Sequence, residues 1–83
     1  MNVRLHPHAK ARLAERGATE DEVIAAVQHG EQFPAKYDRV GFRRIIVFEA
    51  MWHGRHYKFK KVEAYAVREN GWLVITVIVK FFG

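Results

Sequence analysis

The chain begins with hydrophobic positions at helical spacing and then changes to the alternation that is typical of strands. Pro7 suits the first turn of a helix, where its missing N–H is not needed. We expect this helix to span residues 8–16 and to end at Gly17, which adopts the left-handed conformation without a side-chain penalty. The segment Thr19-Glu-Asp-Glu22 is a capping box for a second helix that ends at Gly30. Two helices joined by a tight turn predict an αα-hairpin.

The rest of the chain predicts a sheet. Segments with the composition or alternation of strands are a short edge strand at 3–5, then 33–37, 42–49, 57–68 and 72–82. The last is the most apolar and is expected to be central, and Asn70-Gly71 before it favours a tight hairpin turn. The predicted fold is α+β, with the N-terminal αα-hairpin packed on one face of a three- to four-stranded antiparallel sheet, in a single domain that spans residues 1–83.

Alternation also assigns side chains to the two faces of this sheet. The face against the helices is expected to carry Leu73, Ile75, Val77, Val79 and Phe81 of the last strand, with Val62, Ala64 and Ala66 of the strand before it. The opposite face then carries Trp72, Val74, Thr76, Ile78 and Lys80 of the last strand, with Tyr57, Phe59, Lys61, Glu63 and Tyr65 of the strand before it. Such a mixture of aromatic and charged residues suits an open face, a second apolar layer or a dimer interface.

Composition adds charge to this picture. The formal net charge is +5 and the isoelectric point about 9.9, a balance that favours polyanionic partners, although a merely basic protein is an equally good reading of charge alone. Cysteine is absent, which excludes disulfides and thiolate metal sites and fits a reducing compartment. The N-terminus lacks the apolar region of a signal peptide, and no apolar run is long enough to span a bilayer. We therefore expect a cytoplasmic protein without a membrane segment.

The candidate chemistry lies in the first predicted helix. His8, Arg12 and Arg16 are four residues apart and would stack along one helical stripe. An imidazole titrates near neutral pH and can act as acid or base, while guanidinium groups bind phosphate through forked hydrogen bonds. Metal-independent RNA cleavage needs these groups, so His8 and Arg12 are the candidate catalytic residues and Arg16 a phosphate ligand. In the structural alternative His8 caps the first helix, Arg12 pairs with Glu15, and Arg16 pairs with the acidic turn at 20–21.

Further basic residues extend this candidate surface. An electrostatic track for nucleic acid is expected to include Arg43, Arg44, Lys58, Lys60 and Lys61. Lysines on an edge strand also discourage aggregation, which is the alternative reading of the basic run 55–61. The histidine pairs at 6 and 8 and at 53 and 56 lack the ligand spacing of a metal site. We expect neither a metal nor a cofactor.

Motifs along nearly the whole chain carry a family resemblance. They comprise His8, Ala9, Arg12, Arg16 and Gly17 at the start, then residues 41–44, 58–65 and 74–77. With these motifs the chain resembles domain of unknown function family 4258. The resemblance implies a fold similar to the barnase–EndoU–colicin–RelE group of metal-independent ribonucleases, many of which are toxins with cognate antitoxins. It also implies a site at His8 and Arg12, with Arg16 and Thr76 nearby, whereas the insert at 51–56 departs from the pattern.

These inferences predict a metal-independent RNA-cleaving or RNA-binding domain of the toxin-like kind, and they leave open whether it is an enzyme. One alternative is a non-catalytic RNA- or ribosome-associated module, and another is a regulatory protein-interaction domain. RNA is the first expected partner. An acidic protein, such as an antitoxin, and a second copy of the chain in a homodimer are the others.

Overall fold

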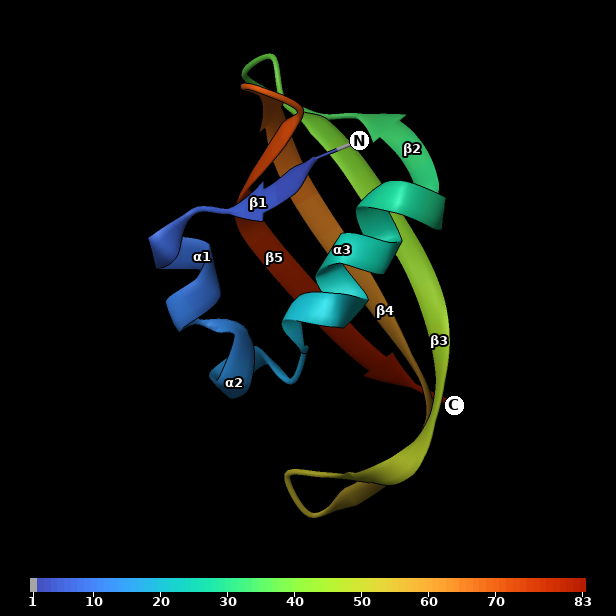
Figure 1. Cartoon of the computed structure of the whole chain (residues 1–83). Helices are drawn as coiled ribbons and strands as arrows, with labels where there is room; N and C mark the ends of the chain where they lie inside the picture. Colours follow the sequence, from blue (N-terminus) through green and yellow to red (C-terminus); the bar gives the residue numbers. More distant parts are fainter. Residues whose placement is uncertain (1) are drawn as a thin grey trace.

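The computed structural model describes residues 2–83, which form one five-stranded sheet and three helices (Figure 1). The elements in chain order are β1 (Val3–Leu5), α1 (Pro7–Ala11), α2 (Leu13–Arg16), α3 (Glu20–His29), β2 (Glu31–Pro34), β3 (Val40–Trp52), β4 (Arg55–Arg68) and β5 (Trp72–Phe82). In space the strands follow the order β1-β5-β4-β3-β2. Neighbouring strands are antiparallel except β1 and β5, which run parallel, so the sheet is mixed.

The predicted fold class is wrong. The described residues are 55% strand and 23% helix, so the fold is mostly β, and its sheet has five strands instead of three or four. The αα-hairpin is also absent, because the first predicted helix is interrupted at Arg12. There the backbone N–H of Arg12 bonds to the carbonyl of Ala9, three residues back, and α1 ends before α2 begins. The two short helices follow the edge of β5, and α3 alone crosses the sheet (Figure 1).

The short edge strand at the start of the chain is confirmed, but its partner was not predictable from alternation. β1 lies beside the first residues of β5, with Val3 opposite Trp72 and Leu5 opposite Val74. The backbone N–H of His6 extends the pairing with a bond of 2.8 Å to the carbonyl of Val74. Parallel neighbours need a long connection, and here nearly the whole domain supplies it. Beyond Val74, no strand of residues 2–83 pairs with β5 on this side, so β5 forms the edge of the sheet there, which corrects its expected central position.

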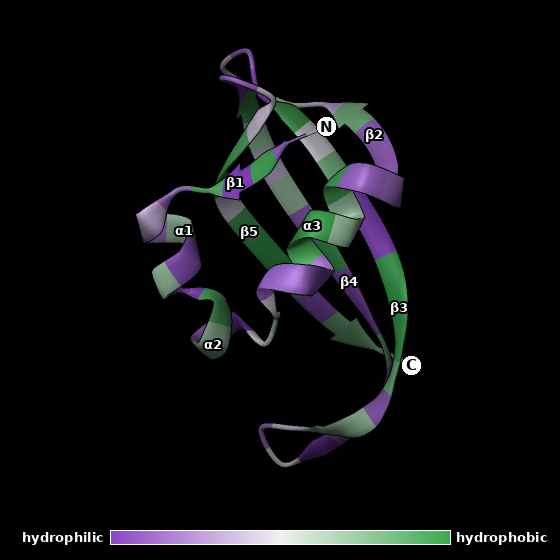
Figure 2. Cartoon of the chain, viewed as in Figure 1, coloured by the Kyte–Doolittle hydropathy of each residue, from purple (hydrophilic) through white to green (hydrophobic). Residues whose placement is uncertain are grey.

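The second predicted helix is confirmed as α3, including its start. The Thr19 hydroxyl accepts a bond from the Glu22 N–H at 3.1 Å, and the Glu22 carboxylate accepts one from the Thr19 N–H at 2.9 Å. Its apolar stripe lies against β3 and β4, and the helix is hydrophilic at its two ends and apolar in the middle (Figure 2). No helix within residues 2–83 has the length and apolar character needed to cross a membrane.

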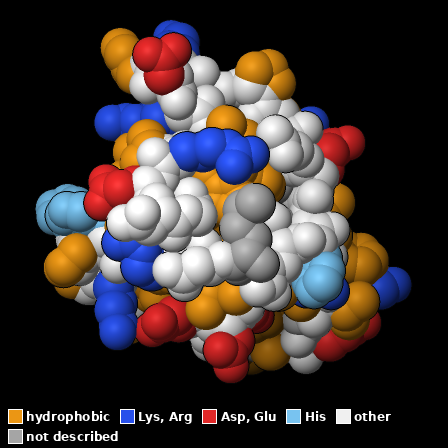
Figure 3. Space-filling view, turned by 45° about the horizontal axis from the view of Figure 1, so that its top comes forward, with side chains coloured by type: hydrophobic (Ala, Val, Ile, Leu, Met, Phe, Trp, Pro, Cys, Tyr) orange, Lys and Arg blue, Asp and Glu red, His pale blue; other side chains and the backbone are white. Residues whose placement is uncertain are grey.

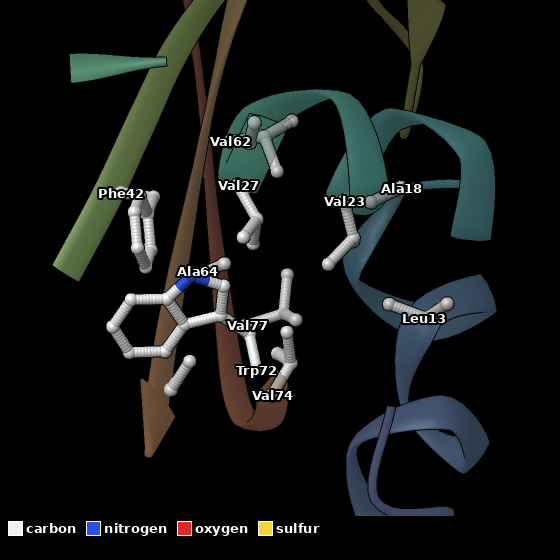
Figure 4. Packing of buried hydrophobic residues seen from close by; sticks show 12 residues of the cluster. Leu13, Ala18, Val23, Val27, Phe42, Val62, Ala64, Trp72, Val74 and Val77 are labelled. Carbon is white, nitrogen blue, oxygen red and sulfur yellow. The ribbon is translucent and has the colours of Figure 1, made fainter. Parts of the chain in front are cut away.

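The core lies between α3 and one face of the sheet (Figure 4). Trp72 belongs to this core, and its ring lies 5.1 Å from that of Phe42 in an edge-on arrangement. Small residues on β4 allow α3 to approach closely. The buried cluster consists of Leu13, Ala18, Val23, Ala26, Val27, Phe42, Val62, Ala64, Ala66, Trp72, Val74 and Val77.

A β-bulge in β5 changes the predicted assignment of faces. Tyr65 pairs with Thr76 and Ala66 with Val74, so Ile75 is an extra residue with no partner on β4. The extra residue reverses the alternation, and Trp72 and Val74 point into the core although the period-two pattern placed them outside. After the bulge the prediction is correct, because Val77 is again buried on the helical face.

Candidate functional site

The two candidate catalytic residues lie on the surface of α1 and its junction with α2. His8 is exposed, and the residue that caps α1 is His6, whose Nδ1 accepts a bond from the His8 N–H at 3.1 Å. Arg12 is also exposed and lies 3.6 Å from the Glu15 carboxylate, as the ion-pair alternative predicts. Because the helix is interrupted at Arg12, the continuous stripe of His8, Arg12 and Arg16 does not form.

Arg16 has a different environment. Its guanidinium is half-buried and donates a bond of 2.5 Å to the carbonyl of Val77 on β5. This carbonyl is free to accept because β1 covers only the first residues of β5. Arg16 does not pair with the acidic turn, where Glu20 lies 3.5 Å from Lys10 instead. The contact with Val77 holds α2 against the edge of the sheet.

A cleft opens at this edge, between α2, the end of β3 and β5. Its volume is about 510 Å³, and its lining consists of Glu15, Arg16, Trp52, Thr76, Ile78, Val79 and Phe81. We call this the edge cleft. It brings Arg16 together with Thr76, two of the predicted site residues that are far apart in sequence. His8 and Arg12 are not among its lining residues.

Trp52 reaches the edge cleft because the β3–β4 hairpin bends. β3 has a β-bulge here, because the two residues between Val47 and Ala50 lie opposite a single residue of β4. Glu49 in this bulge has a φ of 44°. Bulges of this kind re-aim a strand, and the hairpin tip bends back toward α2 (Figure 1). There the Trp52 ring stacks on Phe81 with 4.9 Å between centroids.

Trp52 and Glu15 line the site but were not predicted for it, and Trp52 lies in the insert that departs from the family pattern. A local signal was present. His53 and Gly54 both have positive φ and form the two-residue turn that closes the hairpin. A turn predicted at these two residues extends the flanking strands to Trp52 and Arg55. The sequence near the turn does not indicate that the hairpin tip lies beside α2.

The expected electrostatic track is divided between the two faces of the sheet. Lys60 and Arg44 lie on the helical face, opposite Phe81 and Val62 in the register, whereas Lys61 lies on the other face. Lys60 is only 5% exposed, and its Nζ bonds to the Gly17 carbonyl at 2.8 Å and the Glu22 carboxylate at 2.7 Å. Lys60 therefore joins α2 and α3 and is not available to a ligand.

Several other cations already have acidic neighbours. Arg43 bonds to Glu31 at 2.5 Å and lies over the ring of Phe33, and Lys61 lies 3.3 Å from Glu63. Lys58 is exposed. On the face shown in Figure 3, basic and acidic side chains are interspersed and do not form one continuous basic patch.

The sheet face opposite α3 is uncovered by any segment of residues 2–83. Large apolar side chains on it are exposed, namely Ile45, Val47, Ile78 and Phe82. Near its centre Tyr65 donates a hydrogen bond of 3.2 Å to the Glu63 carboxylate. Partial burial of Tyr65, and then the negative charge of Glu63, raise the pKa of this tyrosine above its ordinary value. We call this surface the open face.

The histidine pairs do not assemble into a metal centre. Within the described part of the chain no three His, Cys, Asp or Glu side chains come close enough to hold an ion. His56 lies 3.6 Å from Glu49 across the hairpin, where the two can pair when the imidazole is protonated.

The edge cleft is therefore the candidate site, and its chemistry is one cation, one carboxylate, one hydroxyl and an aromatic wall. The resemblance to a ribonuclease-like family stays a prediction. No family model, no curated protein and no solved structure matches this chain.

Proposed function

We propose that the protein binds single-stranded RNA at the edge cleft. The observation that carries the proposal is the meeting of Arg16, Thr76 and Trp52, from three separate elements, around one opening of about 510 Å³. Arg16 would hold a phosphate, Thr76 would contact the ribose, and the aromatic wall would lie against a base. The predicted resemblance to an RNA-directed family agrees with this choice of ligand.

Arg16 can bind a phosphate without losing its structural contact. A guanidinium has five N–H donors, and the bond to Val77 is the one side-chain hydrogen bond of Arg16 within residues 2–83. The remaining donors keep the fork geometry that suits phosphate oxygens. The net charge of +5 favours the approach of a polyanion to this site.

The other lining residues suit a nucleotide. Trp52 and Phe81 form a partly buried aromatic wall. The Trp52 ring is stacked between Phe81 and His53, so a base would make apolar contact with the edges of this wall. Thr76 provides a hydroxyl that can bond to the 2′-hydroxyl, the group by which proteins distinguish RNA from DNA.

The first experiment measures binding of a fluorescent oligouridine over a range of salt concentrations. We expect affinity to fall as salt rises, because bound phosphates release counterions. Arg16→Gln keeps a donor for Val77 but removes the charge, so it should weaken binding and reduce the salt slope by about one. Lys10→Gln removes the same charge from exposed Lys10, which is not among the residues lining the cleft, and should change the slope less. An unchanged slope in Arg16→Gln would overturn the proposal.

Cleavage is the second candidate, and Glu15 in the edge cleft is the observation that favours it. A carboxylate beside a phosphate can act as a general base. However, the expected imidazole of His8 is not among the lining residues, and this supports binding without cleavage. The same incubations test the point: RNA that stays intact supports binding alone, whereas fragmentation that is lost in Glu15→Gln supports an endoribonuclease at this cleft. Absence of salt-dependent RNA binding would favour an acidic protein partner.

A further inference from the structure

A second hollow lies on the open face, beneath the turn between β2 and β3. Its volume is about 400 Å³. Of the predicted site residues only Thr76 lines it, and the function proposed above does not use it. Its lining includes the rings of Phe33, Tyr37 and Tyr65, the cations Lys36 and Arg39, and Thr76. We call it the turn hollow. Aromatic rings beside positive charges are the chemistry that receives bases and phosphates of an unpaired strand.

The floor of the turn hollow is set by Gly41. A side chain at this position would come within 2.3 Å of the Phe33 ring, so the missing side chain allows Phe33 to lie flat on β3. In this place the Phe33 ring meets Tyr65 edge-on, with 5.8 Å between centroids. Two aromatic rings are therefore held in a fixed position on the sheet.

The wall of the turn hollow is Tyr37, whose position packing does not explain. Tyr37 is 82% exposed, and both it and Asp38 have positive φ values, 61° and 58°. Non-glycine residues in this conformation are strained and cluster at ligand-binding positions. The turn is closed by the bond from the Ala35 N–H to the Arg39 carbonyl at 3.2 Å. A large aromatic ring is thus presented to solvent by a constrained turn.

The turn hollow and the edge cleft adjoin at β5. Thr76 and Ile78 line both, because β5 is the edge of the sheet at these residues and its side chains are reachable from either side. A strand that leaves the edge cleft over Thr76 therefore arrives beside Tyr37. Lys36 and Arg39 at the far side have the charge needed for its next phosphates.

We propose that the turn hollow is a second base-binding subsite, in which Tyr37 stacks a base of the same single-stranded RNA that occupies the edge cleft. This inference rests on the proposed function. It adds a path for the strand, across the edge of β5 and onto the open face, and it requires a ligand longer than the edge cleft alone can hold.

The experiment compares two oligouridines, one of about two nucleotides and one of about eight, the longer being within the size range that a small β-domain occupies. Tyr37→Ala should weaken binding of the longer strand by about ten- to one-hundred-fold, the usual effect of removing one stacked base, and leave the shorter strand unaffected. Tyr37→Phe keeps the ring and should bind as the parent chain does. Val47→Ala, a substitution at the other end of the open face, is the matched control for an exposed apolar side chain.

Two results separate the hypotheses. If Tyr37→Ala binds the longer strand as tightly as the parent chain while Arg16→Gln weakens it, the turn hollow is not a subsite and the edge cleft remains one. If neither strand binds the parent chain, the proposed function itself fails. The circular dichroism spectrum of each variant is compared with that of the parent chain to check that the sheet is intact.

Discussion

The charge of Lys60 predicts a surface residue that binds nucleic acid, whereas the structure gives it a buried, structural role. It belongs to a basic run, yet its ammonium is buried between the Gly17 carbonyl and the Glu22 carboxylate. We expect Lys60→Met to lower the free energy of unfolding by about 2–4 kcal/mol, because the carbonyl and the carboxylate lose their shared donor. Urea denaturation measures this loss.

Lys58→Met is the matched control for that substitution. Lys58 is two residues away on the same strand but exposed, so its replacement should change stability by no more than about 0.5 kcal/mol. Equal losses in the two variants would mean that the buried bonds of Lys60 contribute nothing beyond a surface charge.

The β3–β4 hairpin shapes the site through its packing against α2. Gly17 ends α2 with a φ of 82°, and a side chain there would meet Phe81 at 2.7 Å and Trp52 at 3.0 Å. Gly17→Ala should therefore cost about 2–3 kcal/mol, part from the left-handed backbone and part from displacement of the aromatic wall. Tryptophan fluorescence should shift to the red as Trp52 becomes more exposed.

Gly54 in the hairpin turn separates these two contributions. Its φ of 80° is nearly the same, but no atom lies within 4 Å of the position a side chain would take. Gly54→Ala should cost only the backbone part, about 1 kcal/mol, without a fluorescence shift. Equal costs at the two glycines would show that the hairpin moves away from α2 freely.

The molecule as a whole has its core on one side of the sheet. Val62 on the helical face is fully buried, whereas Val47 on the open face is 69% exposed. Val62→Ala should destabilise the protein by about 2–3 kcal/mol, because it removes buried methyl groups and leaves a cavity. Val47→Ala should change stability by no more than about 0.5 kcal/mol. Thermal unfolding of both variants tests this asymmetry, and similar losses would indicate that something covers the open face in solution.

Part of the fold was predictable because it depends on neighbours in the chain. The capping box at Thr19 and Glu22, the left-handed cap at Gly17 and the buried stripe of α3 all arise within a few residues. The small residues of β4 were likewise assigned to the correct face. The first helix was mispredicted because its pattern continues through Arg12 while its hydrogen bonds do not.

The candidate site was predictable only in part. The sequence supplied Arg16 and Thr76, and the structure places both in the edge cleft. Trp52 and Glu15 were not predicted, and Lys60 was assigned to a surface although it is buried. Trp52 and Lys60 differ from the prediction because of contacts between residues distant in sequence: Trp52 meets Phe81 where the hairpin bends, and Lys60 meets Gly17 and Glu22.

By itself the sequence determined the local structure: where α3 begins and ends, the approximate positions of the strands and the positive charge. The exception is the predicted strand at 33–37, because β2 spans Glu31–Pro34 and residues 35–37 belong to the turn after it. Only the tertiary structure decided that β1 lies parallel to β5, that bulges reverse the faces of β5 and re-aim the β3–β4 hairpin, and that Arg16 turns to the edge of the sheet. The physical reason is that capping and periodicity act between residues a few positions apart. Strand partners and the positions of bulges are chosen by packing between residues that are far apart along the chain.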